Sequence, residues 1–164
     1  MSIAAEITGI TLAEAMEFVW IEADLLDSAG YEEWLALWTP DGRYIVPIDP
    51  AETDFEATLN LAYDDAAIRR KRVERLTSGS SISASPVART VRLLSRFRLL
   101  RSDADSCELR CAQILTEFRR ERERIYTANI HFHLKRTPSG LKIDKKIVWL
   151  INSTAAPMGI GYIL

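Results

Sequence analysis

The chain has 164 residues, of which 48% are hydrophobic and 27% are charged, so we expect one globular domain spanning residues 1–164. The formal net charge of −2 gives no overall positive field, which argues against nucleic acid and anionic membranes as partners. The apolar runs are too short to cross a bilayer and the first residues lack a signal-peptide pattern, so we expect a cytoplasmic protein.

The first third of the chain has the pattern of two helices. Thr11 and Glu14 have the spacing of a capping box, in which a hydroxyl and a carboxylate satisfy the first N–H groups of a helix. This helix carries one largely apolar stripe and ends before Gly30. The stripe consists of Ala15, Phe18, Val19, Glu22, Leu25 and Leu26. A short second helix is predicted over residues 31–38, and it ends at a turn formed by residues 39–42.

A short strand and a third helix are predicted next. The strand covers residues 43–47. Asp64 is a suitable N-cap for a helix that runs to Leu76. Three apolar side chains of this helix should face the core: Ile68, Val73 and Leu76.

The second half alternates apolar and polar residues, and this period of two predicts four long sequential strands. They occupy residues 90–102, 109–120, 124–135 and 141–151. Their apolar sets are Val91, Leu93, Phe97 and Leu99; Ile114, Thr116 and Phe118; Tyr126, Ala128, Ile130, Phe132 and Leu134; and Leu141, Ile143, Ile147, Trp149 and Ile151. Helices followed by strands predict an α+β fold, with a strongly curved mixed or antiparallel sheet wrapped around the N-terminal helices.

Arginines stand out around the first long strand. Arg92, Arg96 and Arg98 should share its polar face, and they need carboxylate partners such as Glu117 across the sheet or an interface. This surplus predicts a trimer of the isolated chain, or a hexamer with a larger subunit. Arg89 stands where a loop enters the sheet, and its guanidinium fork could fix the path of that loop. All five residues are structural or interface candidates.

Four collinear blocks of this sequence resemble the small, β subunits of aromatic-ring-hydroxylating dioxygenases. The first block reads FVWIEADLLD at 18–27, YEEWLAL at 31–37 and DGRYIVP at 41–47. The second reads LAYDD at 61–65 and RVERL at 72–76, followed by Gly79. The third is PVART at 86–90, and the last is LKIDKKIVWLIN at 141–152.

The resemblance implies a cone of the nuclear-transport-factor-like, or SnoaL-like, type. It also implies a complex of three small and three large subunits. In such complexes the large, α subunit carries a Rieske iron–sulfur cluster and a mononuclear iron, and electrons come from NADH through separate redox proteins. This chain would then hold no cofactor, and its role in the catabolism of aromatic compounds would be to support the α subunit.

The cysteines and histidines do not have the spacing of an iron site. A Rieske centre needs two Cys/His pairs. Cys107 and Cys111 fall in one predicted strand, where four residues span about 13 Å, too far for a disulfide or a shared iron. His131 and His133 share one side of a strand, but basic residues follow where a carboxylate ligand would be needed. We therefore expect two surface or interface histidines and no bound metal.

An enzymatic alternative stays open, because related cones include dehydratases, isomerases and cyclases that use acid–base chemistry. Such a site needs a carboxylate or histidine with a shifted pKa and a polar partner in an apolar pocket. The candidates for this pocket are Asp24, Tyr44, Tyr63 and His131.

Two charged runs are interpreted as surfaces rather than polyanion sites. Helical spacing should distribute the basic residues 69–72 around the helix axis. The run 119–124 alternates in sign, which is typical of an ion-pair surface.

Overall fold

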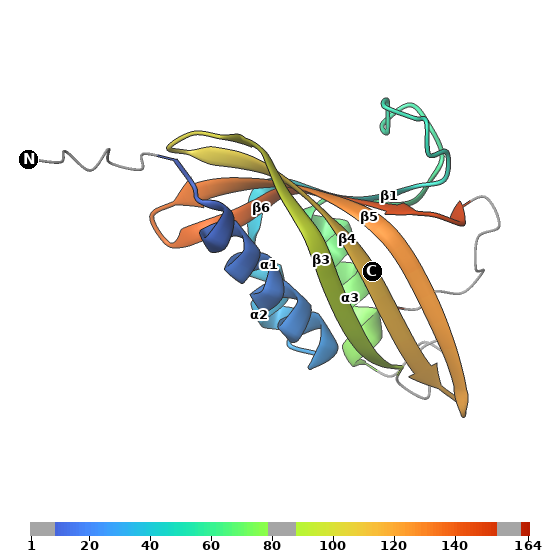
Figure 1. Ribbon diagram of the computed structural model, residues 1–164. Coiled ribbons are helices and arrows are strands. Elements are labelled where there is room, and N and C mark those ends of the chain that lie inside the picture. The colour runs from blue at the N-terminus through green and yellow to red at the C-terminus, as the bar shows by residue number, and fades with distance from the viewer. Residues whose placement is uncertain (1–8, 79–87, 154–161) are drawn as a thin grey trace, which may run out of the picture.

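The computed structural model describes residues 9–78, 88–153 and 162–164 (Figure 1). In this part of the chain the helices are α1 (Leu12–Asp27), α2 (Tyr31–Leu35) and α3 (Ala66–Thr77). The strands are β1 (Trp38–Pro47), β2 (Asn60–Asp64), β3 (Arg89–Ser102), β4 (Ser106–Arg119), β5 (Arg122–Thr137) and β6 (Gly140–Leu150).

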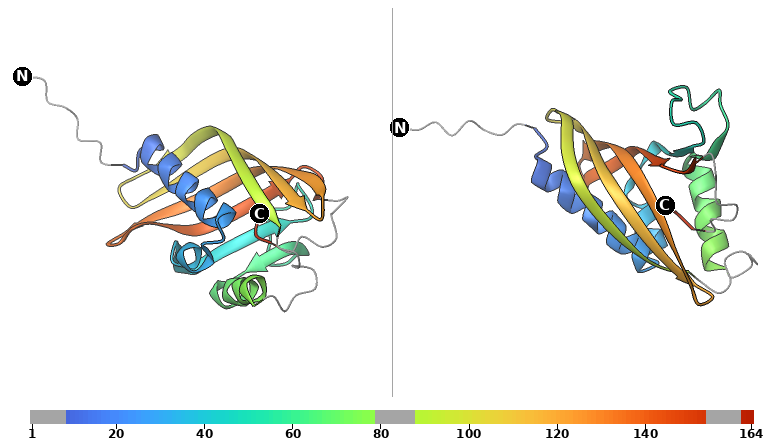
Figure 2. Two further views of the ribbon diagram at one scale, coloured as in Figure 1. Left: turned by 90° about the horizontal axis from the view of Figure 1, so that it is seen from below. Right: turned by 45° about the vertical axis from the view of Figure 1, so that its right-hand side comes forward.

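The six strands form one sheet in the order β2-β1-β6-β5-β4-β3. The β1–β6 pair is parallel and the other pairs are antiparallel, so the sheet is mixed. The sheet is strongly curved and does not close, and the helices lie on its concave side (Figure 2). Here α1 packs along β3, α3 packs against β1, and α2 contacts both helices. The predicted α+β cone is confirmed.

The start of α1 follows the prediction. The Thr11 hydroxyl accepts a hydrogen bond from the Glu14 N–H at 3.1 Å. The Glu14 carboxylate instead pairs with Arg136 of β5 at 2.8 Å, which ties the helix start to the sheet. The predicted stripe is buried apart from Leu25, which is half-buried.

Two local predictions between α2 and α3 are wrong. Residues 39–42 make no turn; they lie inside β1, in an irregularity between Trp38 and Arg43 where β1 pairs with β6. Gly42 is required there, because an added Cβ would come within 2.9 Å of the main-chain oxygen of Ile143. The N-cap of α3 is Asp65 rather than Asp64. The Asp64 carboxylate instead binds Arg72 through two hydrogen bonds of 2.6 and 2.9 Å.

The inward face of β3 also differs from the prediction. Arg96 has a φ of 55°, and the pairing of β3 with β4 shifts between Ser95 and Arg98. Such a bulge inserts an unpaired residue, so alternate positions face inward in opposite parity on its two sides. After the bulge Phe97 and Leu99 pack against the core as predicted, but before it Arg92 is buried and Val91 and Leu93 are about 60% exposed.

A second irregularity has the same effect on β6. Its register against β5 shifts between His133 and Leu134. Beyond this point Lys146, Val148 and Leu150 face the interior, while Trp149 packs against Phe55 on the outer face. The predicted apolar set of β5 is buried as expected, but Ile151 after β6 is 70% exposed.

Candidate functional site inside the cone

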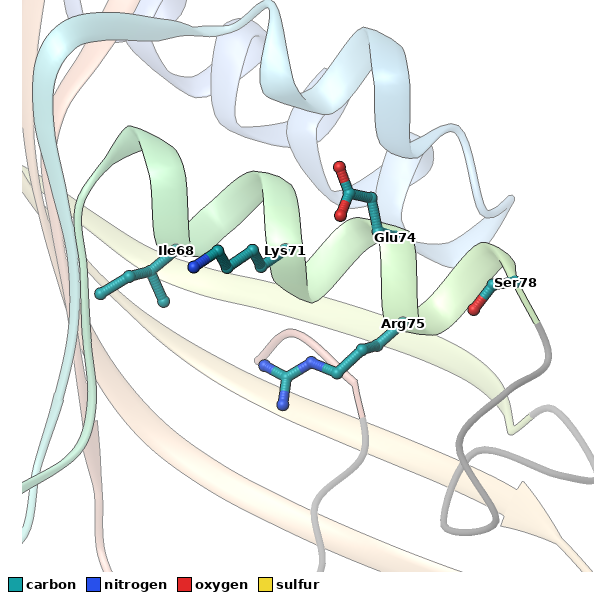
Figure 3. A pocket seen from close by; sticks show the side chains of 5 residues that line it. All are labelled: Ile68, Lys71, Glu74, Arg75 and Ser78. Atoms are coloured by element: carbon teal, nitrogen blue, oxygen red, sulfur yellow. The ribbon is translucent and has the colours of Figure 1, made fainter.

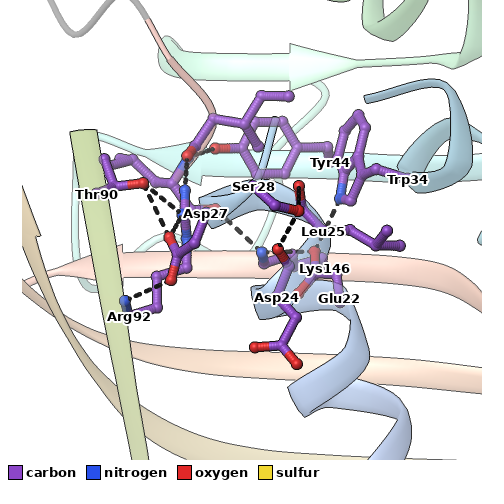
Figure 4. Close-up of polar contacts among 12 residues, drawn as sticks. Glu22, Asp24, Leu25, Asp27, Ser28, Trp34, Tyr44, Thr90, Arg92 and Lys146 are labelled. Carbon is purple, nitrogen blue, oxygen red and sulfur yellow. Dashed lines mark hydrogen bonds and ion pairs between the residues drawn. The ribbon is translucent and has the colours of Figure 1, made fainter. Parts of the chain in front are cut away.

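A buried ion pair occupies the concave side of the sheet. Glu22 on α1 and Lys146 on β6 lie 2.8 Å apart, and their side chains are 3% and 0% exposed (Figure 4). The same carboxylate oxygen accepts a hydrogen bond of 3.0 Å from the indole nitrogen of Trp34 on α2. Two helices and the central strand are thus joined through one oxygen atom.

Residues 162–164 fill the space beside this pair. The Lys146 ammonium also donates to the main-chain oxygen of Leu164 at 3.0 Å. The Leu164 N–H donates to the Tyr44 hydroxyl at 3.0 Å, and the Arg92 guanidinium donates to the main-chain oxygen of Ile163. Ile163 and Leu164 are 1% and 3% exposed, so this segment is part of the core.

Asp27 connects the end of α1 to β3 through polar contacts. Its carboxylate accepts hydrogen bonds from the Thr90 hydroxyl and the Arg92 main-chain N–H, each 2.8 Å long, and it pairs with the Arg92 guanidinium (Figure 4). Arg92 therefore links three distant segments: α1, β3 and residues 162–164.

The ionisable groups of the interior are strongly affected by burial. Burial lowers the pKa of Lys146, although the adjacent Glu22 opposes this effect. Burial raises the pKa of Tyr44 to about 12, and it raises the pKa of the free thiols Cys107 and Cys111 to about 11 and about 12. The phenol and both thiols are therefore protonated at neutral pH, and the thiols are poor nucleophiles.

The interior holds the residue types that acid–base catalysis uses, but the chain itself occupies them. A general base must reach a substrate proton, and a general acid must reach the substrate atom that it protonates. The Glu22 oxygen is held by Lys146 and Trp34, and the Tyr44 oxygen accepts the Leu164 N–H. The arrangement is that of a structural core.

The four residues of the predicted catalytic pocket are not brought together. Tyr44 lies in the interior. Asp24 is exposed and its carboxylate points away from the cluster (Figure 4). Tyr63 and His131 alternate with inward-facing neighbours and so lie on the outer face of the sheet. The sheet therefore separates Tyr44 from Tyr63 and His131.

The buried pair of Glu22 and Lys146 was not predicted, although the sequence indicates part of it. Glu22 stands within the apolar stripe of α1, a position where a carboxylate is almost always paired when buried. Lys146 stands in the otherwise apolar end of β6. The shift in register that turns Lys146 inward has no obvious sequence signature.

Comparison with known proteins places this chain in a family. Residues 21–156 match the family described as "Ring hydroxylating beta subunit". The small oxygenase component of the p-cumate 2,3-dioxygenase system of Pseudomonas putida is 30% identical over 152 residues, which are 92% of this chain and 84% of that protein. The chain belongs to the ring-hydroxylating β subunit family. It is thus a component of an oxidoreductase, as the resemblance implied.

Solved structures agree on the fold of this β subunit. The β subunit of benzoate 1,2-dioxygenase from Burkholderia mallei has a TM-score of 0.77 at 22% identity, with 94% of this chain and 98% of that chain covered. An NTF2-like protein with a cystatin-like fold from Novosphingobium aromaticivorans has a TM-score of 0.60 at 17% identity, with 85% and 81% covered. These likenesses confirm the nuclear-transport-factor-like cone.

The arginine candidates of the β subunit have separate environments. Within the chain Arg92 pairs with Asp27, and not with Glu117 as predicted. Arg96 donates to the Asn129 side chain, and Arg98 is exposed. Glu117 is buried and accepts a hydrogen bond of 2.7 Å from the Tyr162 hydroxyl.

The role of Arg89 in fixing the loop before β3 stays a prediction, because residues 79–87 of that loop lie outside the described part. Arg89 is exposed, and its side chain has no hydrogen-bond or ion-pair partner among residues 9–78, 88–153 and 162–164. Pro86 and Val87 of the PVART block are among the residues outside the described part. The exposed Arg89 side chain stays a candidate for a contact with another subunit.

The basic run of α3 is scattered around the helix, as predicted. Arg69 is buried with its guanidinium 4.1 Å from the centre of the Trp38 ring, and Arg72 binds Asp64. Arg70 lies 3.5 Å from Glu32 of α2. Lys71 lines a surface pocket beside Ile68, Glu74, Arg75 and Ser78 (Figure 3). This pocket mixes apolar, acidic and basic side chains, so it does not form a positive patch.

The described residues of the β subunit contain no group of three or more His, Cys, Asp or Glu side chains that could hold a metal ion. His131 and His133 lie half-buried on the outer face, and a nitrogen of His133 is 4.0 Å from the Glu108 carboxylate. No helix in the described ranges is long and apolar enough to cross a membrane.

These histidines make the stability of the β subunit sensitive to acid. Burial lowers the pKa of both His131 and His133 from the ordinary value of 6.5. As the pH falls through about 6.5, the unfolded chain takes up protons that the folded chain does not, so stability is lost until the folded pKa is reached. We expect the melting temperature to fall more steeply between about pH 7.5 and 5.5 in the wild type than in a His131→Gln/His133→Gln variant. Parallel curves would show that neither histidine contributes.

Proposed function

We propose that this chain is a non-catalytic β subunit that supports the iron-bearing α subunit of an aromatic-ring dioxygenase. The Rieske cluster and the mononuclear iron then reside in the α subunit. The supporting observation is the interior of the cone, where Glu22 binds Lys146, and where Lys146, Tyr44 and Arg92 bind residues 163–164 of the same chain. We place the assembly in the cytoplasm, because both cysteines are free thiols, as in a reducing compartment.

The outer face of the sheet supports assembly into a trimer. Five large apolar side chains on adjacent strands β3, β4 and β5 are 44–61% exposed. We call this set the outer apolar patch: Val91, Leu93, Ile114, Phe118 and Ile125. Strand pairing places Leu93 opposite Ile114. Contiguous exposed apolar surface of this kind marks contacts with other proteins, and we assign it to a second copy of the chain.

Charges placed in this patch should break the trimer. We expect Leu93→Glu and Ile125→Glu each to shift the isolated chain from trimer to monomer, because each would bury an unpaired carboxylate at the interface. Sedimentation velocity measures the change. Leu59→Glu is the matched control, because Leu59 is 85% exposed outside the patch. A wild-type chain that stays monomeric at high concentration would refute the assignment.

The function itself is tested by reconstitution. The chain is purified alone and after co-expression with the large subunit of its own dioxygenase. We expect the chain alone to lack ring-hydroxylating activity, and the complex to be active when reductase components and NADH are supplied. A large subunit that is equally active and equally stable without this chain would contradict the supporting role.

A further inference from the structure

Residues 162–164 belong to none of the six strands, yet side chains on three of those strands bind their main chain. The Leu164 N–H donates to the Tyr44 hydroxyl of β1 at 3.0 Å, and the Leu164 main-chain oxygen accepts from Lys146 of β6 at the same distance (Figure 4). Arg92 of β3 donates to the preceding main-chain oxygen. These contacts recognise a peptide backbone, because none of them involves a side chain of the segment.

The side chains of the segment have specific contacts of their own. The Tyr162 hydroxyl donates to Glu117 of β4 at 2.7 Å, and its ring packs edge-on against Tyr126 of β5 with a centroid distance of 6.2 Å. Ile163 and Leu164 are 1% and 3% exposed. Hydrogen bonds along a main chain combined with buried side chains are how receptors bind extended peptides.

The groups that bind this main chain are held in place by other parts of the cone. The Arg92 guanidinium pairs with Asp27, and the Lys146 ammonium pairs with Glu22. The Tyr44 ring packs edge-on against two tryptophan rings. Each cation therefore keeps a partner when the segment is absent, so no isolated charge would be left buried. A site whose groups are oriented in advance binds its ligand at a lower entropic cost.

We infer that the interior of the cone is a peptide-binding site, and that residues 162–164 occupy it as a ligand in cis. The ligand class is a short peptide in which an aromatic residue with a hydroxyl group precedes two aliphatic residues. Because the segment is tethered to the cone, its effective concentration is high, and the site of the intact chain is closed to a competing peptide. The same peptide supplied in trans binds once the segment has been removed.

The test supplies the segment in trans to a chain from which residues 162–164 have been deleted. The probe is the tripeptide acetyl-Tyr-Ile-Leu at millimolar concentration. We expect the deletion to lower the melting temperature by about 5 °C or more. The probe should restore much of this loss, because a ligand that binds only the folded state stabilises it. The wild type should show no rise, since its site is occupied. A deleted chain that melts at the wild-type temperature would overturn the inference.

A second probe tests the main-chain contact. Methylation of the leucine nitrogen in the tripeptide removes the N–H that Tyr44 accepts, so binding to the deleted chain should weaken by about tenfold. In a Tyr44→Phe background the difference between the two probes should shrink. Tyr63→Phe is the matched control, because its hydroxyl lies on the outer face, and it should keep the full difference. Equal binding of the two probes to the deleted chain would contradict recognition of the backbone.

A full-length variant keeps the inference testable when the deleted chain fails to fold. Ile163→Gly/Leu164→Gly retains the main chain but removes both buried side chains, which weakens binding in cis. We expect acetyl-Tyr-Ile-Leu to raise the melting temperature of this variant, and the reordered peptide acetyl-Leu-Ile-Tyr to have a smaller effect. If acetyl-Tyr-Ile-Leu stabilises neither variant, residues 162–164 are an inseparable part of the core and the inference is wrong. Equal stabilisation by the two peptides would also overturn it.

Discussion

Lys146→Met should lower the free energy of unfolding by about 3–5 kcal/mol, the usual cost of removing one partner from a buried ion pair. Methionine fills much of the same volume but leaves the Glu22 carboxylate buried beside Trp34 without a cation. It also removes the donor to the main-chain oxygen of Leu164. Urea denaturation at one fixed protein concentration measures the loss.

A double variant separates the charge from the packing. We expect Glu22→Gln/Lys146→Met to recover part of the loss, because the neutral amide can still accept the Trp34 N–H and no charge stays buried. Lys145→Met is the control on the same strand, since Lys145 is only partly buried. If Lys146→Met costs no more than Lys145→Met, the ion pair does not hold the interior together.

Trp34→Ala should cost a similar amount, about 3–5 kcal/mol. Trp34 is fully buried, and its ring packs edge-on against Trp38 and Tyr44, with centroid distances of 5.4 and 6.5 Å. Its removal leaves a cavity and withdraws the hydrogen bond to Glu22. Thermal and urea unfolding both report the change.

Two further variants sharpen this prediction. Trp34→Phe should cost less than Trp34→Ala, because it keeps most of the packing and loses chiefly the hydrogen bond. Trp20→Ala should cost less still, since Trp20 is 43% exposed and packs edge-on against Phe97 alone among the aromatic rings of the described residues. Equal losses at Trp20 and Trp34 would show that burial in the cone is not what makes Trp34 important.

Hydrophobic periodicity and helix capping predicted most of the architecture. The helix start at Thr11 and the apolar set of β5 follow from local patterns, and the structure confirms both. Local patterns failed where β3 and β6 shift register, because one extra residue exchanges the faces of a strand. Arg92 was therefore placed on the polar face of its strand, and Lys146 was not recognised as an inward-facing residue.

The interior site was the hardest part to predict, because its contacts join residues far apart in the chain. Glu22 and Lys146 are separated by 124 positions, and Tyr44 and Leu164 by 120. No local pattern reports such a pairing. Asp24 was chosen for the predicted pocket, whereas the buried carboxylate of α1 is Glu22, which stands within the apolar stripe.

The position of residues 162–164 has a consequence for how the chain folds during its synthesis. Helix α1 leaves the ribosome early, yet Glu22 cannot form its ion pair until Lys146 has been synthesised. Tyr44 and Arg92 cannot form their hydrogen bonds with Leu164 and Ile163 until those residues have been synthesised. Contacts of such long sequence separation form late and slowly. Until translation has passed residue 164, the nascent chain therefore exposes an unfinished core. A chaperone or a neighbouring subunit that binds before that point would meet a cone whose interior lacks residues 162–164, and after it a cone that these residues fill.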